Sequence, residues 1–171
     1  MPVLQSARLD FELLQESDAA FFFELVGEPG WIAGIGDKGF RDLDDARREI
    51  REKYIAKQAE QGFSLYRISL RADGSPIGLC GLVSRPSLPH VDLGYALLSR
   101  YTGQGYAQEA ALAVRDFARD VLQLPALMGI VNPENRASQK VLEKTGMRCI
   151  SRAEVDGKPT WTYLLEFSTP A

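Results

Sequence analysis

The sequence predicts one mixed α/β domain over residues 1–171, and three observations carry this prediction. Three strand-like segments follow one another between residues 63 and 98, which indicates an antiparallel meander. A long helical pattern then separates the third of these segments from a short apolar one, so residues 91–131 are predicted to form a strand, helix, strand crossover. A chain of 171 residues with 45% hydrophobic content can bury the core of one domain, whereas two would be cramped.

The first predicted elements are a strand and a helix. Residues 8–14, RLDFELL, alternate between polar and apolar side chains with the period of a strand. Ser17 and Asp18 follow, and both are residue types that cap a helix, which we predict over residues 19–26.

A glycine-rich stretch separates this helix from the next one. Residues 27–40, GEPGWIAGIGDKGF, are expected to form a mobile loop, in which Trp31 and Phe40 are candidates to line an acceptor pocket. The segment 42–62 is predicted to be an amphipathic helix that ends at Gly62, because its apolar residues lie at helical spacing: Leu43, Ala46, Ile50 and Tyr54.

The remaining elements follow the same patterns. Asp73 and Gly74 supply a hairpin turn between strands predicted at 63–70 and 75–85, and a third strand is predicted at 91–98. The other predicted elements are helices at 105–122 and 134–146, the second stopped by Gly146, and strands at 126–131, 147–155 and 160–167.

Charge and cysteine usage narrow the classes of function. A net charge of -3 without any block of like charges argues against a nucleic-acid partner. With two distant cysteines, Cys80 and Cys149, and one histidine, His90, we expect no metal site and free core thiols in a reducing compartment. Because the start of the chain lacks a targeting pattern and no segment is long enough to span a bilayer, we expect a cytoplasmic protein with no membrane partner.

Two glycines, Gly103 and Gly105, stand directly in front of the helix predicted at 105–122. They suit either a tight turn or the close approach of an anion to the free N–H groups of a helix start. A dinucleotide motif is disfavoured because Gln108 replaces its third glycine, and because the next strand ends at Asn132 rather than at an acidic residue. A Walker lysine and hydroxyl are also lacking after the second glycine.

The residues around these glycines resemble a known family. Arg100, Gly103 and Gly105 fit the pattern R/Q-x-x-G-x-G/A of the GNAT superfamily of acyl-CoA-dependent N-acetyltransferases. The segments GYAQEA and NRASQKVLEKTGM are similar to the branch that includes ribosomal-protein N-terminal acetyltransferases, and the likeness covers nearly the whole chain. The resemblance implies a central, mostly antiparallel, splayed seven-stranded sheet flanked by about four helices.

The resemblance also implies acetyl-CoA as cosubstrate and a set of residues that bind it. Its pyrophosphate would be held in the turn that begins at Arg100, by the backbone N–H groups of five consecutive residues: Gly103, Gln104, Gly105, Tyr106 and Ala107. The pantetheine arm would run beside the backbone of Leu97, Leu98 and Ser99. Asn135 is expected to bond the pantetheine or to cap its helix, and Ser138 to lie near the thioester sulfur or only to pack in the helix.

Acyl transfer to an amine needs a base, a polarised thioester carbonyl and a proton for the leaving thiolate. Strand alternation places Asp92 on one face with small neighbours, Gly94 and Ala96, and this face is predicted to be open to substrate. We interpret Asp92 as the general base, acting directly or through water, or else as a structural acid at a strand start. The resemblance implies a tyrosine on the last helix as the proton donor to the thiolate, as in many superfamily members, but this helix has none. Ser138 or solvent is therefore expected to protonate the thiolate, and the N–H of Leu98 or its neighbour to polarise the carbonyl.

Two classes of function remain open from the sequence. The first is an acetyl-CoA-dependent N-acetyltransferase that moves an acetyl group directly to a primary amine, either a protein N-terminus or a small molecule. The second is a non-catalytic acyl-CoA-binding sensor. A homodimer is compatible with either class.

Overall fold

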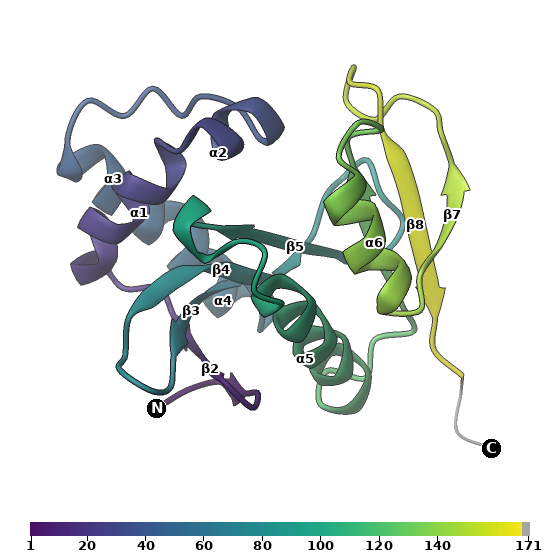
Figure 1. The fold of residues 1–171 in the computed structure, drawn as a ribbon, viewed down its shortest axis with the longest axis horizontal. Helices are drawn as coiled ribbons and strands as arrows, with labels where there is room; N and C mark the ends of the chain where they lie inside the picture. Colours follow the sequence, from purple (N-terminus) through teal and green to yellow (C-terminus); the bar gives the residue numbers. More distant parts are fainter. Residues whose placement is uncertain (169–171) are drawn as a thin grey trace.

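The computed structural model describes residues 1–168, and it confirms the mixed α/β fold. One sheet has the strand order β1-β2-β3-β4-β5-β6-β8-β7 (Figure 1). The strands are β1 (Leu4–Gln5), β2 (Leu9–Leu13), β3 (Leu65–Leu70), β4 (Pro76–Val83), β5 (Asp92–Leu97), β6 (Ala126–Val131), β7 (Arg148–Ser151) and β8 (Trp161–Glu166). A sheet of seven strands was expected, and residues 1–168 form eight. The additional strand is the two-residue β1, which pairs with β2 through Leu4 and Phe11.

The helices match the prediction except in one stretch. They are α1 (Ala19–Val26), α2 (Pro29–Gly34), α3 (Leu43–Glu49), a π-helical segment (Ile50–Ile55), α4 (Ala56–Gln61), α5 (Tyr106–Asp120) and α6 (Arg136–Lys144). The segments from α3 to α4 run on as the single helix expected at 42–62, and Gly62 ends it with a φ of 85°.

The mobile loop predicted at 27–40 is wrong in part, because it contains α2. Pro29 stands in the first turn of α2, where its fixed φ favours the helix and its missing N–H costs nothing. Trp31 is buried and its ring meets the ring of Phe22 edge to face, with centroids 6.3 Å apart. Phe40 is partly buried and also packs on Phe22, with ring centroids 5.8 Å apart. Trp31 thus belongs to the core and Phe40 lies against it, and their place in an acceptor pocket stays a prediction.

The sheet divides between β5 and β6. β4 and β5 are paired along their length, from Gly78 and Leu97 to Val83 and Asp92, and β6 and β8 are paired equally well. β5 and β6 run parallel but are joined in register at only one position, Asp92 with Met128. The sheet is therefore splayed, as predicted, and β5 presents a largely unpaired edge beyond Asp92 (Figure 1).

Apolar side chains pack on both faces of this sheet. The cluster on one face takes side chains from α5 and α6, and the cluster on the other takes them from α1, α2 and α3. Leu93, Tyr95 and Leu97 of β5 lie with the first cluster, whereas Ala96 and Leu98 lie with the second, which confirms the predicted alternation. Figure 1 shows α1, α2 and α3 gathered at one end of the view, with α6, β7 and β8 at the other and β5 between them.

Several single-residue expectations can be compared with the fold. Cys80 and Cys149 are both free, but only Cys80 is buried; Cys149 is exposed on β7, so the prediction of a second core thiol is wrong. Within residues 1–168, no helix is long and apolar enough to cross a bilayer. The same residues contain no group of three or more His, Cys, Asp or Glu side chains that could hold a metal ion.

Candidate active site

The turn between β5 and α5 has the backbone that its glycines predict. A short 3-10 turn, Ser99–Tyr101, follows β5, and then Gly103 and Gly105 adopt φ values of 75° and 83°. Both values lie in the left-handed region that side chains disfavour, and Gly105 is the N-cap of α5. A Cβ atom placed on Gly103 would meet nothing within 4 Å, so the turn is also open on its outer side.

This turn exposes a run of unused backbone donors. The first helical hydrogen bond of α5 runs from the N–H of Glu109 to the carbonyl of Gly105, at 3.1 Å. Within the part of the chain that the structure describes, the backbone N–H groups of residues 103–108 donate to no other protein group. They include all five of the N–H groups predicted to hold a pyrophosphate. Because α5 is fifteen residues long, its dipole adds positive potential at the same place.

A cation that sequence reasoning missed lies against this turn. The Nη1 atom of Arg8, at the start of β2, donates to the carbonyl of Gln104 at 3.1 Å, and its guanidinium lies 4.3 Å from the ring centroid of Tyr106. Its Nε atom donates to Glu109 at 2.7 Å. Nothing in the local sequence indicates these contacts, because they join residues about a hundred positions apart.

Arg100, which the motif points to, is directed elsewhere. Its Nη1 atom donates to the Glu24 carboxylate on α1 at 2.6 Å, so its side chain is not among the free donors of the turn. The side chain of Arg100 is more than half exposed, so its expected place in the cofactor site stays a prediction, and its carbonyl accepts from the Gln104 side chain at 3.1 Å. The neighbouring Ser99 N–H lies 3.3 Å from an oxygen of Glu28.

The backbone groups of β5 that face β6 are not those of Leu98, as expected, but those of residues in the opposite phase of the strand. The N–H of Leu98 donates to Ile77 at 2.9 Å and its carbonyl accepts from Tyr101, so the Leu98 N–H is not available to polarise a thioester. The carbonyl of Val91 accepts from Met128 of β6 at 2.8 Å. Since successive residues of a strand point their backbone groups to opposite sides, those of Leu93, Tyr95 and Leu97 point toward β6. The N–H of Leu93 takes part in the bridge to Met128, so the backbone groups that face the open gap are those of Tyr95 and Leu97.

Asp92 is buried rather than open, which corrects the prediction for this face. Its side chain is 2% exposed and its Oδ2 atom accepts from Nε of Arg85 at 2.8 Å. Oδ1 has no hydrogen-bond partner among residues 1–168. Burial raises the pKa of the Asp92 carboxyl to about 6, although the Arg85 guanidinium acts in the opposite direction. An acid whose pKa lies just below neutral pH is mostly ionised there and suits proton transfer, and a buried one suits transfer through water.

The start of α6 brings together a cap and a hydroxyl pair. The Oδ1 atom of Asn135 accepts from the backbone N–H of Ser138 at 3.1 Å, so Asn135 caps the helix, as one of its two expected roles requires. The Oγ atom of Ser138 lies 2.7 Å from the hydroxyl of Tyr95. Sequence reasoning looked for a tyrosine on the last helix and missed Tyr95, which reaches that helix from β5.

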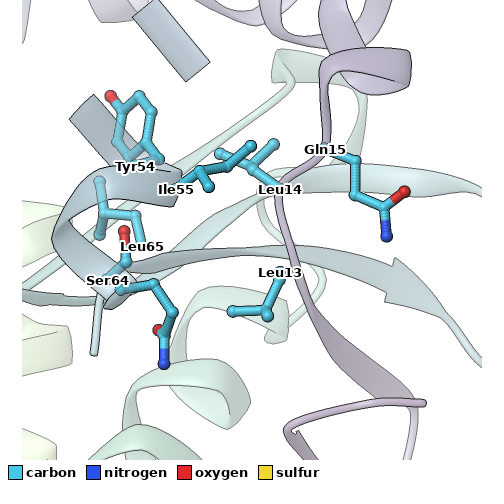
Figure 2. Close-up of a pocket in the computed structure, with 8 residues that line it drawn as sticks. Leu13, Leu14, Gln15, Tyr54, Ile55, Ser64 and Leu65 are labelled. Carbon is cyan, nitrogen blue, oxygen red and sulfur yellow. The ribbon is translucent and has the colours of Figure 1, made fainter. Parts of the chain in front are cut away.

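A separate cavity lies at the other side of the sheet (Figure 2). Its volume is about 200 Å³ and it is lined by the end of β2, the start of β3 and the helix between them: Leu13, Leu14, Gln15, Tyr54, Ile55, Gln58, Ser64 and Leu65. None of the predicted site residues lines it. A drug-sized ligand needs roughly 300–1,000 Å³, so this cavity is too small for a nucleotide-sized cosubstrate.

Known proteins share sequence with this chain. Residues 8–148 match the acetyltransferase (GNAT) domain. The chain is 28% identical to the YkkB protein of Bacillus subtilis, over 94% of this chain and 93% of the relative. It is 30% identical to the probable N-acetyltransferase YjcK of the same organism, over 70% of this chain and 67% of the relative.

Solved structures share the fold over nearly the whole chain. An acetyltransferase from Agrobacterium tumefaciens superposes with a TM-score of 0.82 and 30% identity, covering 98% of this chain and 95% of the other. RimL, a ribosomal L7/L12 α-N-protein acetyltransferase in complex with coenzyme A, superposes with a TM-score of 0.78 over 97% and 98% of the two chains. At 17% identity, RimL bears on the fold alone.

Proposed function

We propose that this chain, which belongs to the GNAT family of acetyltransferases, transfers an acetyl group from acetyl-CoA directly to a primary amine in a ternary complex. The observation that carries the proposal is the row of unused N–H groups at residues 103–108, beside the splayed edge of β5. A row of donors at a helix start is suited to a pyrophosphate, and an unpaired strand edge is suited to an amide-containing arm.

The residues of the turn and of β5 divide the binding of acetyl-CoA between them. Gly103, Gln104, Gly105, Tyr106 and Ala107 would offer backbone N–H groups to its pyrophosphate. Leu97, with its backbone groups on the gap side of β5, would pair with the pantetheine arm, and Ser99 would lie at the end of that arm. Asn135 would add its amide nitrogen, because only its oxygen is used in the cap.

The thioester supplies an acyl group that is open to attack by an uncharged amine. In this proposal Asp92 accepts the proton of the amine through water, because its carboxylate is buried and ion-paired to Arg85. The N–H groups of Tyr95 and Leu97 face the gap beyond the bridge between Asp92 and Met128, and they are the candidates to polarise the thioester carbonyl. Ser138 lies across the gap from β5 and is our candidate to assist the leaving sulfur.

The acceptor is proposed only as a class, a primary amine on a protein N-terminus or a small molecule. RimL, which shares the fold, acts on ribosomal protein L7/L12, and this fits the first possibility without choosing it. The ion pair between Asp92 and Arg85 supports a second candidate, an acyl-CoA-binding sensor without turnover, because a paired carboxylate is a weaker base. Turnover decides between the two.

The test has a binding step and a turnover step. CoA and acetyl-CoA at one hundred times their dissociation constants should stabilise the fold by about 2.7 kcal/mol and raise the melting temperature, whereas NAD and ATP should not. Thiol release from acetyl-CoA is then followed across a panel of peptide N-termini, polyamines, amino acids and drug-like amines. No thermal shift with millimolar CoA, or an equal shift with ATP, would reject the cosubstrate; a shift without thiol release from any amine would favour the sensor.

A further inference from the structure

The Tyr95 hydroxyl and the Ser138 hydroxyl join two parts of the molecule that otherwise diverge. Tyr95 belongs to β5 and Ser138 to α6, which follows β6, and β5 and β6 are in register only at Asp92 and Met128. The 2.7 Å contact between the two oxygen atoms therefore crosses the gap between the splayed strands. This gap is where the proposed function places the thioester.

Either hydroxyl can be the donor in this hydrogen bond, and the choice of donor decides what the serine proton can do. Each hydroxyl has one proton, and burial raises the pKa of the Tyr95 phenol, so the phenol keeps its proton at neutral pH. Cys80, opposite Tyr95 on β4, is the titratable neighbour on that side, and its deep burial raises the pKa of its thiol, so it adds no charge. When the phenol donates to Oγ of Ser138, the serine proton is free to point to a third group.

The backbone holds Ser138 in place for such a role. Its N–H is bonded to the Asn135 side chain at 3.1 Å, which fixes the first turn of α6. The serine hydroxyl can then vary only by rotation about its side-chain bond, and a donor from Tyr95 on one side selects one orientation of it.

We propose that Tyr95 is a positioning residue, which donates to Oγ of Ser138 and turns the serine proton toward the leaving CoA sulfur. The inference rests on the proposed function, which puts the thioester in the gap. When the carbon–sulfur bond breaks, its electron pair passes to sulfur, and the serine O–H donates a hydrogen bond to the thiolate without giving up its proton. The thiolate then takes a proton from solvent, while the proton of the amine leaves through water and Asp92. Hydrogen bonds to an ionised partner are about twice as strong as neutral ones.

The test measures the pKa of the CoA thiol when CoA is bound, from the ultraviolet absorbance of the thiolate as pH is varied. A free thiol of this kind has a pKa of about 8.5, and a donor aimed at sulfur should lower it by roughly one unit in the complex. We expect Tyr95→Phe to remove at least half of that lowering and Ser138→Ala to remove it entirely. Ser138→Thr, which keeps the hydroxyl, should retain it.

Tyr163→Phe is the matched control. Tyr163 is also a buried tyrosine on a strand, β8, and its hydroxyl also approaches α6, at 3.5 Å from Glu143, but it lies outside the proposed site. This variant should leave the thiol pKa unchanged. If Tyr95→Phe behaves like Tyr163→Phe while both bind CoA, Tyr95 does not position Ser138.

Kinetics give an independent readout once an acceptor is known. Tyr95→Phe should lower kcat by roughly threefold to tenfold with KM for acetyl-CoA unchanged, and adding it to Ser138→Ala should cost nothing further, because both residues act through one hydroxyl. Additive losses would overturn the proposal. If Tyr95→Phe does not fold, an unchanged thiol pKa in Ser138→Ala also overturns it. Failure of the parent to bind CoA would instead reject the proposed function.

Discussion

The side chains of Arg8 and Glu109 tie the start of β2 to the first turn of α5, with Nε of Arg8 donating to Oε2 of Glu109 at 2.7 Å. Oε1 of the same carboxylate accepts from the Arg8 backbone N–H at 2.7 Å and from the Ser6 hydroxyl at 2.6 Å. Arg8 also donates to the carbonyl of Gln104, so this group of contacts includes the glycine turn. The turn that carries the free N–H groups is therefore held by Arg8, a residue about a hundred positions earlier in the sequence.

Glu109→Gln should destabilise the fold and weaken CoA binding together. The substitution keeps the shape of the side chain but replaces a carboxylate that accepts three hydrogen bonds with an uncharged amide. Because the Arg8 side chain is nearly half exposed, we expect the free energy of unfolding to fall by only about 1 kcal/mol. CoA affinity should fall by roughly threefold to tenfold, as the turn is less well held. Urea unfolding and calorimetric titration with CoA measure the two effects.

The control and the pH dependence follow from the same contacts. Asp120→Asn, in an exposed pair with Arg119 at the far end of α5, should change neither quantity.

Burial opposes ionisation of Glu109, but hydrogen bonds from Ser6 and Arg8 prevail and lower the pKa of its carboxyl below 4.5. Because the folded-state pKa of Glu109 lies below the unfolded-state value, its carboxylate stabilises the fold above that value. The advantage of the parent over Glu109→Gln should therefore begin to decrease as pH falls below about 4.5 and be lost once pH has fallen through the folded-state pKa. A constant difference across that range would contradict this account.

Gly105→Val should weaken CoA binding by roughly tenfold or more, beyond any loss of stability. A left-handed φ of 83° costs a branched residue about 1–3 kcal/mol of folding free energy, and the side chain would also enter the space beside Arg8. Gly62→Val is the matched control, because Gly62 has a φ of 85° with nothing within 4 Å of its Cβ position and ends a helix far from the turn. Equal CoA affinity in the two variants would leave Gly105 as a turn residue only.

Local features of the fold could be predicted from the sequence, whereas contacts between distant segments could not. The strands and the glycine turn at Gly103 and Gly105 follow from patterns within a few residues, and these could be predicted. The splayed sheet was expected only from the resemblance to the GNAT superfamily. Arg8 and Tyr95 could not, because their roles depend on which distant segments pack together. The expected place of Leu98 was one residue off, because the phase of backbone bonding in β5 is set by β4.

The exposure of the strand face that carries Asp92 could not be predicted from the size of its neighbours. Alternation correctly grouped Asp92 with Gly94 and Ala96, but small neighbours were taken to mean an open surface. In the structure the side chain of Leu65 lies 3.6 Å from the Cβ position of Gly94, and Arg85 pairs with the carboxylate. Small residues on a strand therefore do not by themselves indicate a face that is open to substrate.

Asp92 should make the fold less stable as pH rises through the range from about 4 to 6. Its folded-state pKa of about 6 lies above the ordinary 3.8, so within that window the folded chain binds more protons than the unfolded chain, and stability falls as those protons leave. Asp92→Asn carries no such proton. The difference in unfolding free energy between Asp92→Asn and the parent should therefore grow in favour of the variant from pH 4 to about 6 and then level off, which urea unfolding at fixed pH values measures.

Proton transfer to Asp92 makes the sharpest prediction for activity. If Asp92 is the base, kcat/KM of the parent should rise with pH through about 6 as the carboxyl ionises, and a second rise should follow the pKa of whichever amine is acetylated. Asp92→Asn should lower kcat by about 10²-fold and lose the first rise while keeping the second. Arg85→Gln should move the first rise to higher pH, because it removes the positive charge that favours the carboxylate. A purely structural Asp92 predicts the opposite pattern: profiles of the same shape in all three proteins from about pH 5 to 9, differing at most by a constant factor.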